Sequence, residues 1–163
     1  MAMIAELLEP ATREVAAAHR PGGRVIASRF GAIVVAPGSE IDFPNGLLGF
    51  GGLRTFALAT LPDERYRDFL ILQSLEDDLV AFLVRPLDPT DGLIATSEID
   101  DACTQLEIPR PDLVLLLVVS VRRQDDKAVL TVNLRAPLFV HTGRRRAVQF
   151  VLPNGSYAIR YVL

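Results

Sequence analysis

Hydrophobic residues in the first half of the chain gather in short runs rich in β-branched and aromatic side chains. Gly, Pro or charged residues bound each run, which is typical of strands. The pattern predicts strands at residues 25–30, 32–36, 55–60, 69–74 and 79–84. A polar connection of hairpin length, residues 75–78, separates the last two, so we expect them to pair antiparallel.

The second half continues the same pattern after one interruption. Residues 113–121 are nearly all aliphatic, which favours a strand buried on both faces, and residues 128–135 alternate between two faces. Further strands are predicted at 138–141, 147–152 and 157–162. So many short strands predict a mainly β fold: a small antiparallel β-barrel-like or sandwiched sheet with one or two short helices.

Two segments have the spacing of helices. Residues 98–106 place apolar side chains on one face, with Ser97 and Asp100 in the positions of a capping box. Residues 2–20 also have a helical pattern, interrupted by Pro10 and ended by Pro21-Gly22-Gly23. We therefore expect residues 1–23 to be an N-terminal extension, partly helical or mobile, before a single β domain at 24–163.

Composition narrows the classes of function. The chain has 163 residues, a net charge of −3, no Trp and three Tyr, so it lacks the basic surface and aromatic platforms of nucleic-acid-binding domains. One Cys and two His are too few for an internal disulfide or a usual zinc site. With acidic residues early in the chain and no long apolar stretch, we expect a cytoplasmic protein without cofactor or membrane span.

The glycine-rich segment after residue 43 does not predict catalysis. It lacks the Gly-Lys-Ser/Thr ending of a nucleotide-binding loop, and neither histidine lies in a known catalytic spacing, so we expect no enzyme. Pro44 and Gly46 instead indicate a shaped loop. Its apolar side chains, Leu47, Leu48 and Phe50, either fill the end of the barrel, the commoner fate, or form a partner-binding patch.

Three segments carry a family resemblance. Ile41-Asp42-Phe43-Pro44-Asn45-Gly46-Leu47-Leu48-Gly49-Phe50 resembles the hallmark segment of the FliW family of flagellar assembly factors. The Leu72-Gln73-Ser74 core before an apolar strand is similar to the family's next motif, and Asn133-Leu134-Arg135-Ala136-Pro137 is similar to a third. Together the matches span about residues 28 to 161.

The resemblance implies a binding protein that acts in the cytoplasm on two partners. It implies binding to flagellin and to the RNA-binding regulator CsrA, so that free protein relieves repression of flagellin synthesis and flagellin restores it. An acidic surface suits a basic regulator, and we expect a monomer. The predicted partner contacts are Leu47, Leu48, Phe50, Gln73, Glu76, Asp77, Asp78 and Asn133, and the predicted loop-shaping residues are Pro44, Gly46, Gly49 and Pro137.

Two alternatives remain open at this stage. The lineage can have kept the fold and changed its partners, because one fold hosts many different binding sites. The chain can also be a β-barrel binding module unrelated to flagella.

Overall fold

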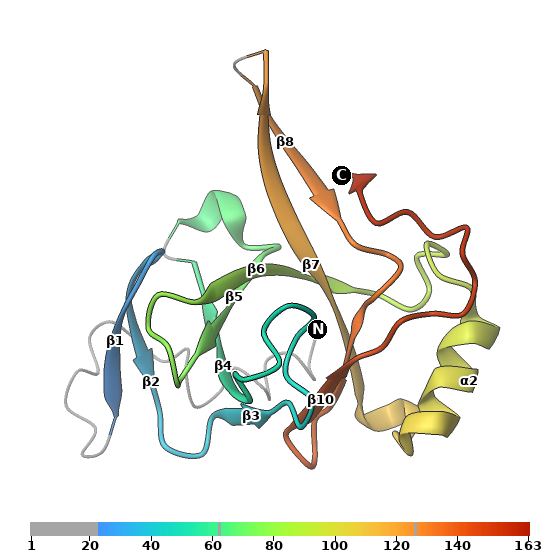
Figure 1. The fold of residues 1–163 in the computed structure, drawn as a ribbon, viewed down its shortest axis with the longest axis horizontal. Helices are drawn as coiled ribbons and strands as arrows, with labels where there is room; N and C mark the ends of the chain where they lie inside the picture. Colours follow the sequence, from blue (N-terminus) through green and yellow to red (C-terminus); the bar gives the residue numbers. More distant parts are fainter. Residues whose placement is uncertain (1–22, 62, 126) are drawn as a thin grey trace.

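A closed β-barrel forms the centre of the molecule. The computed structural model describes residues 23–61, 63–125 and 127–163, and Figure 1 shows the barrel with one α-helix beside it. Seven strands close the barrel in the order β7-β6-β5-β4-β3-β10-β9, and β9 pairs back onto β7. Their bounds are β3 Glu40–Asp42, β4 Thr55–Thr60, β5 Leu70–Ser74, β6 Ala81–Leu87, β7 Leu113–Gln124, β9 Leu138–His141 and β10 Arg146–Gln149.

Strand β7 belongs to two sheets. Its first half pairs with β6 and β9 inside the barrel, whereas its second half leaves the barrel and pairs with β8, Lys127–Val132. The short strand β11, Tyr161–Val162, is added on the far side of β8. We call residues 119–124 with β8 and β11 the arm, and Figure 1 shows it projecting beyond the barrel.

Smaller elements cover the outside of the barrel. The hairpin of β1, Arg24–Ser28, and β2, Gly31–Val35, packs on the outer face of β4 and β5. The helix α2, Thr96–Leu106, packs on the outer face of β7. Two 3₁₀ turns, η1 Glu64–Tyr66 and η2 Arg110–Asp112, lie in connections. No helix in the described ranges is long and apolar enough to cross a membrane.

Because neighbouring side chains on a strand point to opposite faces, each barrel strand serves two clusters. Phe56 and Leu58 of β4 point into the lumen, while Ala57 lies under the β1–β2 hairpin. On β7, Leu116 lies in the lumen cluster and Leu115 in the cluster under α2. Burial on both faces explains why these strands read as apolar runs without polar alternation.

The sequence-based fold class is confirmed, and several boundaries differ from the predicted ones. Strands 55–60 and 138–141 have their predicted bounds. The three-residue strand β3 was not predicted, because it is too short to show an alternation. The strand predicted at 157–162 is reduced to β11. Tyr157 instead contacts the start of α2, where its hydroxyl accepts a hydrogen bond from the Ala95 amide at 3.0 Å.

The predicted helix cap is wrong. Helix α2 starts at Thr96, its N-cap is Ala95, and no side chain caps it. Ser97 is already inside the first turn, where its hydroxyl cannot take the capping position. The helix predicted at 2–20 lies outside the described residues.

Candidate functional site

Residues 43–54 join β3 to β4 across one end of the barrel, and we call them the mouth loop (Figure 1). Phe43 is fully buried in the lumen cluster and packs edge-on against Phe56 at 5.1 Å between ring centroids. Leu47 also lies in this cluster, and Leu53 packs against it. The loop is therefore anchored at several points by side chains that enter the lumen.

Three consecutive tight turns give the mouth loop its path. The amide of Gly46 donates to the Phe43 carbonyl at 2.8 Å, that of Phe50 to Leu47 at 2.7 Å, and that of Leu53 to Phe50 at 3.1 Å. Pro44 is the second residue of the first turn, where its fixed φ is favourable. The amides of these three residues therefore find their hydrogen-bond acceptors within the loop and not on a neighbouring strand.

Two glycines make these turns possible in different ways. Gly46 has φ +63°, and a Cβ there would lie 2.5 Å from the Phe50 carbonyl oxygen and 2.9 Å from that of Leu53. Gly49, the third residue of the second turn, has φ +83° with open space around it. Backbone crowding therefore requires glycine at position 46, whereas only the left-handed conformation favours it at position 49.

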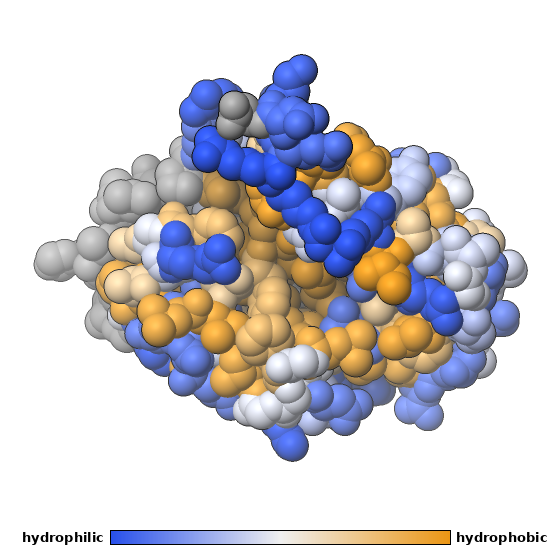
Figure 2. Space-filling model, turned by 45° about the horizontal axis from the view of Figure 1, so that its top comes forward, coloured by the Kyte–Doolittle hydropathy of each residue, from blue (hydrophilic) through white to orange (hydrophobic). Residues whose placement is uncertain are grey.

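The mouth loop presents two apolar side chains outward. Leu47 is only 4% exposed, whereas Leu48 is 62% and Phe50 39% exposed. Phe50 packs edge-on against Phe82 of β6 at 5.1 Å between ring centroids. The loop thus combines both alternatives left open by the sequence, with one side chain in the core and two on the surface. Figure 2 shows apolar residues gathered around a hollow below the hydrophilic tip of the molecule.

Gln149 fixes the exposed part of the loop. Its Oε1 accepts a hydrogen bond from the Leu48 amide at 2.8 Å, and its Nε2 donates to the Ala136 carbonyl at 3.2 Å. Sequence reasoning did not single out this residue, which lies inside the strand predicted at 147–152. Gln149 connects the loop to β10 and to the segment before β9.

The predicted acidic contacts lie in the connection between β5 and β6, residues 75–80, which we call the acidic turn, and each of its three carboxylates has a partner. The carboxylate of Glu76 accepts hydrogen bonds from the amides of Arg54 and Thr55, the latter at 3.0 Å. These bonds, that from Thr55 first, lower the pKa of the Glu76 carboxyl below its ordinary value. Glu76 therefore fixes the end of the mouth loop, and its charge is also accessible because the side chain is exposed.

Asp77 and Asp78 differ in how firmly they are engaged. Oδ1 of Asp78 forms an ion pair with the Arg24 guanidinium at 2.7 Å, which ties the turn to β1. Oδ1 of Asp77 accepts only the amide of Leu79, at 3.0 Å, inside the turn itself. Among the three carboxylates of this turn, Asp77 is the one whose interactions involve no other part of the fold.

The remaining predicted contacts lie inside the fold. Gln73 is fully buried, and its Nε2 donates to the carbonyls of Ser74, Asp78 and Val80. Asn133 Oδ1 accepts the amides of Arg135 and Ala136, at 3.0 and 3.1 Å, and so closes the turn after β8. Pro137 follows this turn, and its carbonyl accepts the Phe150 amide at 3.0 Å. These three residues shape connections that support the mouth loop and the acidic turn.

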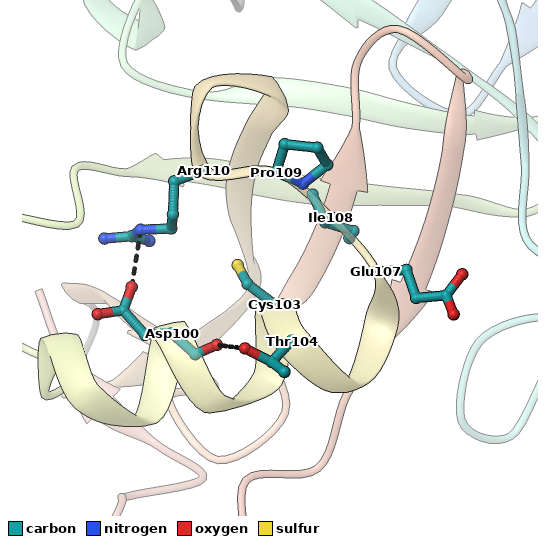
Figure 3. A pocket seen from close by; sticks show the side chains of 7 residues that line it. All are labelled: Asp100, Cys103, Thr104, Glu107, Ile108, Pro109 and Arg110. Atoms are coloured by element: carbon teal, nitrogen blue, oxygen red, sulfur yellow. Dashed lines mark hydrogen bonds and ion pairs between the residues drawn. The ribbon is translucent and has the colours of Figure 1, made fainter.

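A second hollow lies at the end of α2 (Figure 3). The Arg110 guanidinium faces Asp100 at 3.0 Å, and the buried Cys103 thiol lies between the helix and the Pro109 segment. Burial raises the pKa of the Cys103 thiol, which keeps it protonated and weakly nucleophilic. The residues that line the hollow are Asp100, Cys103, Thr104, Glu107, Ile108, Pro109 and Arg110.

Comparison with known proteins places the chain in a family. The family model described as "FliW protein" matches residues 24–163, the whole of the described β domain. The chain belongs to the FliW family. It is 34% identical over 141 residues to the flagellar assembly factor FliW of Syntrophus aciditrophicus, covering 85% of each chain. It is 33% identical over 144 residues to that of Natranaerobius thermophilus, covering 86% of this chain and 91% of the relative.

The fold agrees with this assignment. The crystal structure of a flagellar assembly factor FliW superimposes with a TM-score of 0.67 and 27% sequence identity, covering 85% of this chain and 96% of the other. The family resemblance inferred from three short segments is thereby confirmed. The family match begins at Arg24, so the mouth loop, the acidic turn and the arm all belong to the FliW-like domain.

Proposed function

We propose that this FliW-family chain acts by protein binding, with flagellin on the apolar side of the mouth loop and a CsrA-type regulator beside the acidic turn. The observation that carries the proposal is the outward position of Leu48 and Phe50 on a loop held at both ends by buried contacts. Exchange between the two partners would couple flagellin synthesis to its export. The two surfaces are adjacent, since Glu76 bonds to Arg54, the last residue of the mouth loop, and to Thr55, the first of β4.

The support for apolar binding at the mouth loop is physical. Leu48 and Phe50 occupy defined positions before any partner arrives, because the Gln149 bond and the Phe82 contact already hold them. Ordering a flexible loop on binding costs free energy, and a preformed loop avoids most of this cost. An apolar face of a helical flagellin segment is the kind of partner that such side chains suit.

The support for the regulator at the acidic turn is electrostatic. Asp77 is exposed and engaged only within its own turn, so its charge is available to a basic RNA-binding protein. Charges at the rim of an interface mainly accelerate association, and salt screens this effect. The roles within the predicted acidic set are thus unequal: Glu76 and Asp78 hold distant parts of the fold together, whereas Asp77 bonds only within its own turn.

The test compares two variants with matched controls. Leu48→Asp should weaken flagellin binding by at least about tenfold, roughly the loss of one well-packed apolar contact, measured by biolayer interferometry. Val25→Asp, at a similarly exposed apolar position on β1, is the control and should leave flagellin binding unchanged. Equal effects of the two substitutions would refute the mouth loop as the flagellin surface.

Asp77→Lys should slow association with the CsrA-type regulator at low salt, and Asp101→Lys, an exposed position on α2, should not. A pull-down with the purified chain from extract of its native cells tests both partners together. Retention of neither would favour the alternative in which this lineage keeps the fold and binds other partners.

A further inference from the structure

The outer edge of the arm is apolar and exposed. Tyr161 and Leu163 are each about two-fifths exposed, Val162 is 61% exposed, and the neighbouring Ile159 is 66% exposed. Natural edge strands usually carry charged residues, proline or a bulge that prevents pairing with other chains. Strand β11, Tyr161–Val162, contains no charge, proline or bulge and is protected only by its shortness, so its apolar edge is open to pairing.

The backbone of β11 offers hydrogen-bonding groups to that edge. The amide of Leu163 donates to the Leu130 carbonyl at 3.0 Å, and Tyr161 lies opposite Val132. In an antiparallel pair, bonded and non-bonded positions alternate, so the N–H and C=O of Val162 point away from β8. None of the other described strands pairs with β11. One donor and one acceptor therefore face outward between exposed apolar side chains.

The arm and the segments that flank its strands carry charge of one sign. Residues 113–124, 127–136 and 157–163 contain no Asp or Glu, although the whole chain has 20 acidic and 17 basic residues. Their basic residues are Arg122, Arg123, Lys127, Arg135 and Arg160. Arg135 donates to the Leu152 carbonyl, whereas the other four form no ion pair with another described residue. The sequence between β7 and β8 holds two acids, Asp125 and Asp126.

We propose that the β11 edge docks an extended segment of another protein in which apolar and acidic residues alternate. The segment would add as a strand beside β11, bonding to the Val162 backbone, with its apolar side chains on Tyr161 and Leu163. Its acidic side chains would meet Arg160, the residue just before β11, and would be attracted over a longer distance by the arm's other cations, such as Arg122 on β7. This inference is independent of the mouth loop and of the identity of its partners.

A second copy of the chain suits this edge less well. Two β11 strands paired edge to edge would bring two arms together whose strands carry only positive charge. Strand β11 itself is uncharged, so the repulsion would act between the two whole arms, whose cations lie on β7 and β8. The sign of the charge therefore selects an acidic partner over self-association.

The test uses a fluorescent peptide of about eight residues that alternates Val or Thr with Glu, and a matched peptide with Lys in place of Glu. Fluorescence anisotropy with the full chain should show saturable binding of the acidic peptide, weakening as salt rises, and no binding of the basic one. Equal binding of both peptides, or binding of neither, would overturn the proposal.

Two substitutions of Val162 test whether the acidic peptide binds at the β11 edge rather than at another surface. Val162→Pro removes the outward N–H while leaving the bonds from β11 to β8, so acidic-peptide affinity should fall by about tenfold. Val162→Thr keeps the N–H and should bind within about twofold of the unsubstituted chain. The double variant Arg122→Glu with Arg160→Glu should reverse the preference toward the basic peptide.

A measurement on the unsubstituted chain covers the case in which the proline variant does not fold. Amide hydrogen exchange at Val162 should slow when the acidic peptide is added, while exchange at Ile33 in the β1–β2 hairpin should stay unchanged. Unchanged exchange at Val162 would overturn the proposal. So would a dimer in sedimentation that Val162→Pro dissolves, because the edge would then belong to a second copy.

Discussion

The amide of Leu48 donates a hydrogen bond to Oε1 of Gln149 across 101 positions of sequence. Leu48 is the most exposed apolar residue of the mouth loop, and Gln149 ends the last strand of the barrel. An exposed side chain at a loop tip is normally mobile, but this bond fixes the backbone from which it projects. The position of the proposed binding surface therefore depends on a residue that itself need not touch a partner.

Replacing Gln149 with Leu should lower stability and binding together. The substitution keeps a similar volume but leaves the Leu48 amide and the Ala136 carbonyl without their partner. We expect a loss of about 1–2 kcal/mol in the free energy of unfolding, measured by urea denaturation. Gln149→Glu keeps the acceptor and loses the donor, so its free energy of unfolding should lie between those of Gln149→Leu and the unsubstituted chain. Unchanged stability in Gln149→Leu would contradict the anchoring role.

The two positive-φ glycines of the mouth loop should tolerate alanine very differently. Gly46→Ala places a methyl group against the carbonyl oxygens of Phe50 and Leu53 and adds backbone strain, so unfolding should become easier by about 3 kcal/mol or more. Gly49→Ala meets open space and has only the strain of positive φ, about 1 kcal/mol. Urea denaturation of both variants is the measurement. Equal losses would show that crowding does not distinguish the two positions.

Much of the barrel could be predicted because burial leaves a direct mark on sequence. Residues 55–60 and 138–141 are bounded by turns and filled with apolar side chains, and their strands have the predicted bounds. Strand β3 left no such mark, and the strand predicted at 157–162 was longer than β11, since pairing with distant strands rather than local pattern sets the bounds of both. Closure of the sheet by β7 with β9 is likewise a long-range event.

The candidate site was harder to predict than the fold. Composition could not decide between burial and exposure for Leu47 and Leu48, because adjacent residues of one type differ only in the direction set by a turn. Nor could composition show that the Glu76 carboxylate accepts hydrogen bonds from two backbone amides. These bonds make an exposed charge part of the support of the mouth loop. These facts depend on segments brought together by the closed barrel.

Glu76 should make stability depend on pH. Its folded-state pKa is lowered, so its stabilising contribution is complete above the unfolded value of about 4.3 and is lost as pH falls through the folded value. Glu76→Gln should therefore be less stable than the unsubstituted chain at pH 7, and the difference should shrink below about pH 4. Denaturation of both proteins across this range tests the sign. A difference that stays constant with pH would show that the bonds to Arg54 and Thr55 do not depend on the charge.

The neighbouring residues Leu47 and Leu48 should separate folding from binding. Leu47→Ala removes a side chain that is 4% exposed in the lumen cluster, so unfolding should become easier by about 2–5 kcal/mol. Leu48→Ala removes a side chain that is 62% exposed, and its effect on stability should stay within about 0.5 kcal/mol. If Leu48 contacts flagellin as proposed, Leu48→Ala should nevertheless weaken that complex. Urea denaturation and interferometry on the same two proteins give the four values needed. An unchanged stability of Leu47→Ala would contradict the anchoring of the loop by Leu47 in the lumen. Full flagellin affinity of Leu48→Ala would exclude the Leu48 side chain from the proposed interface, because only an exposed side chain would have changed.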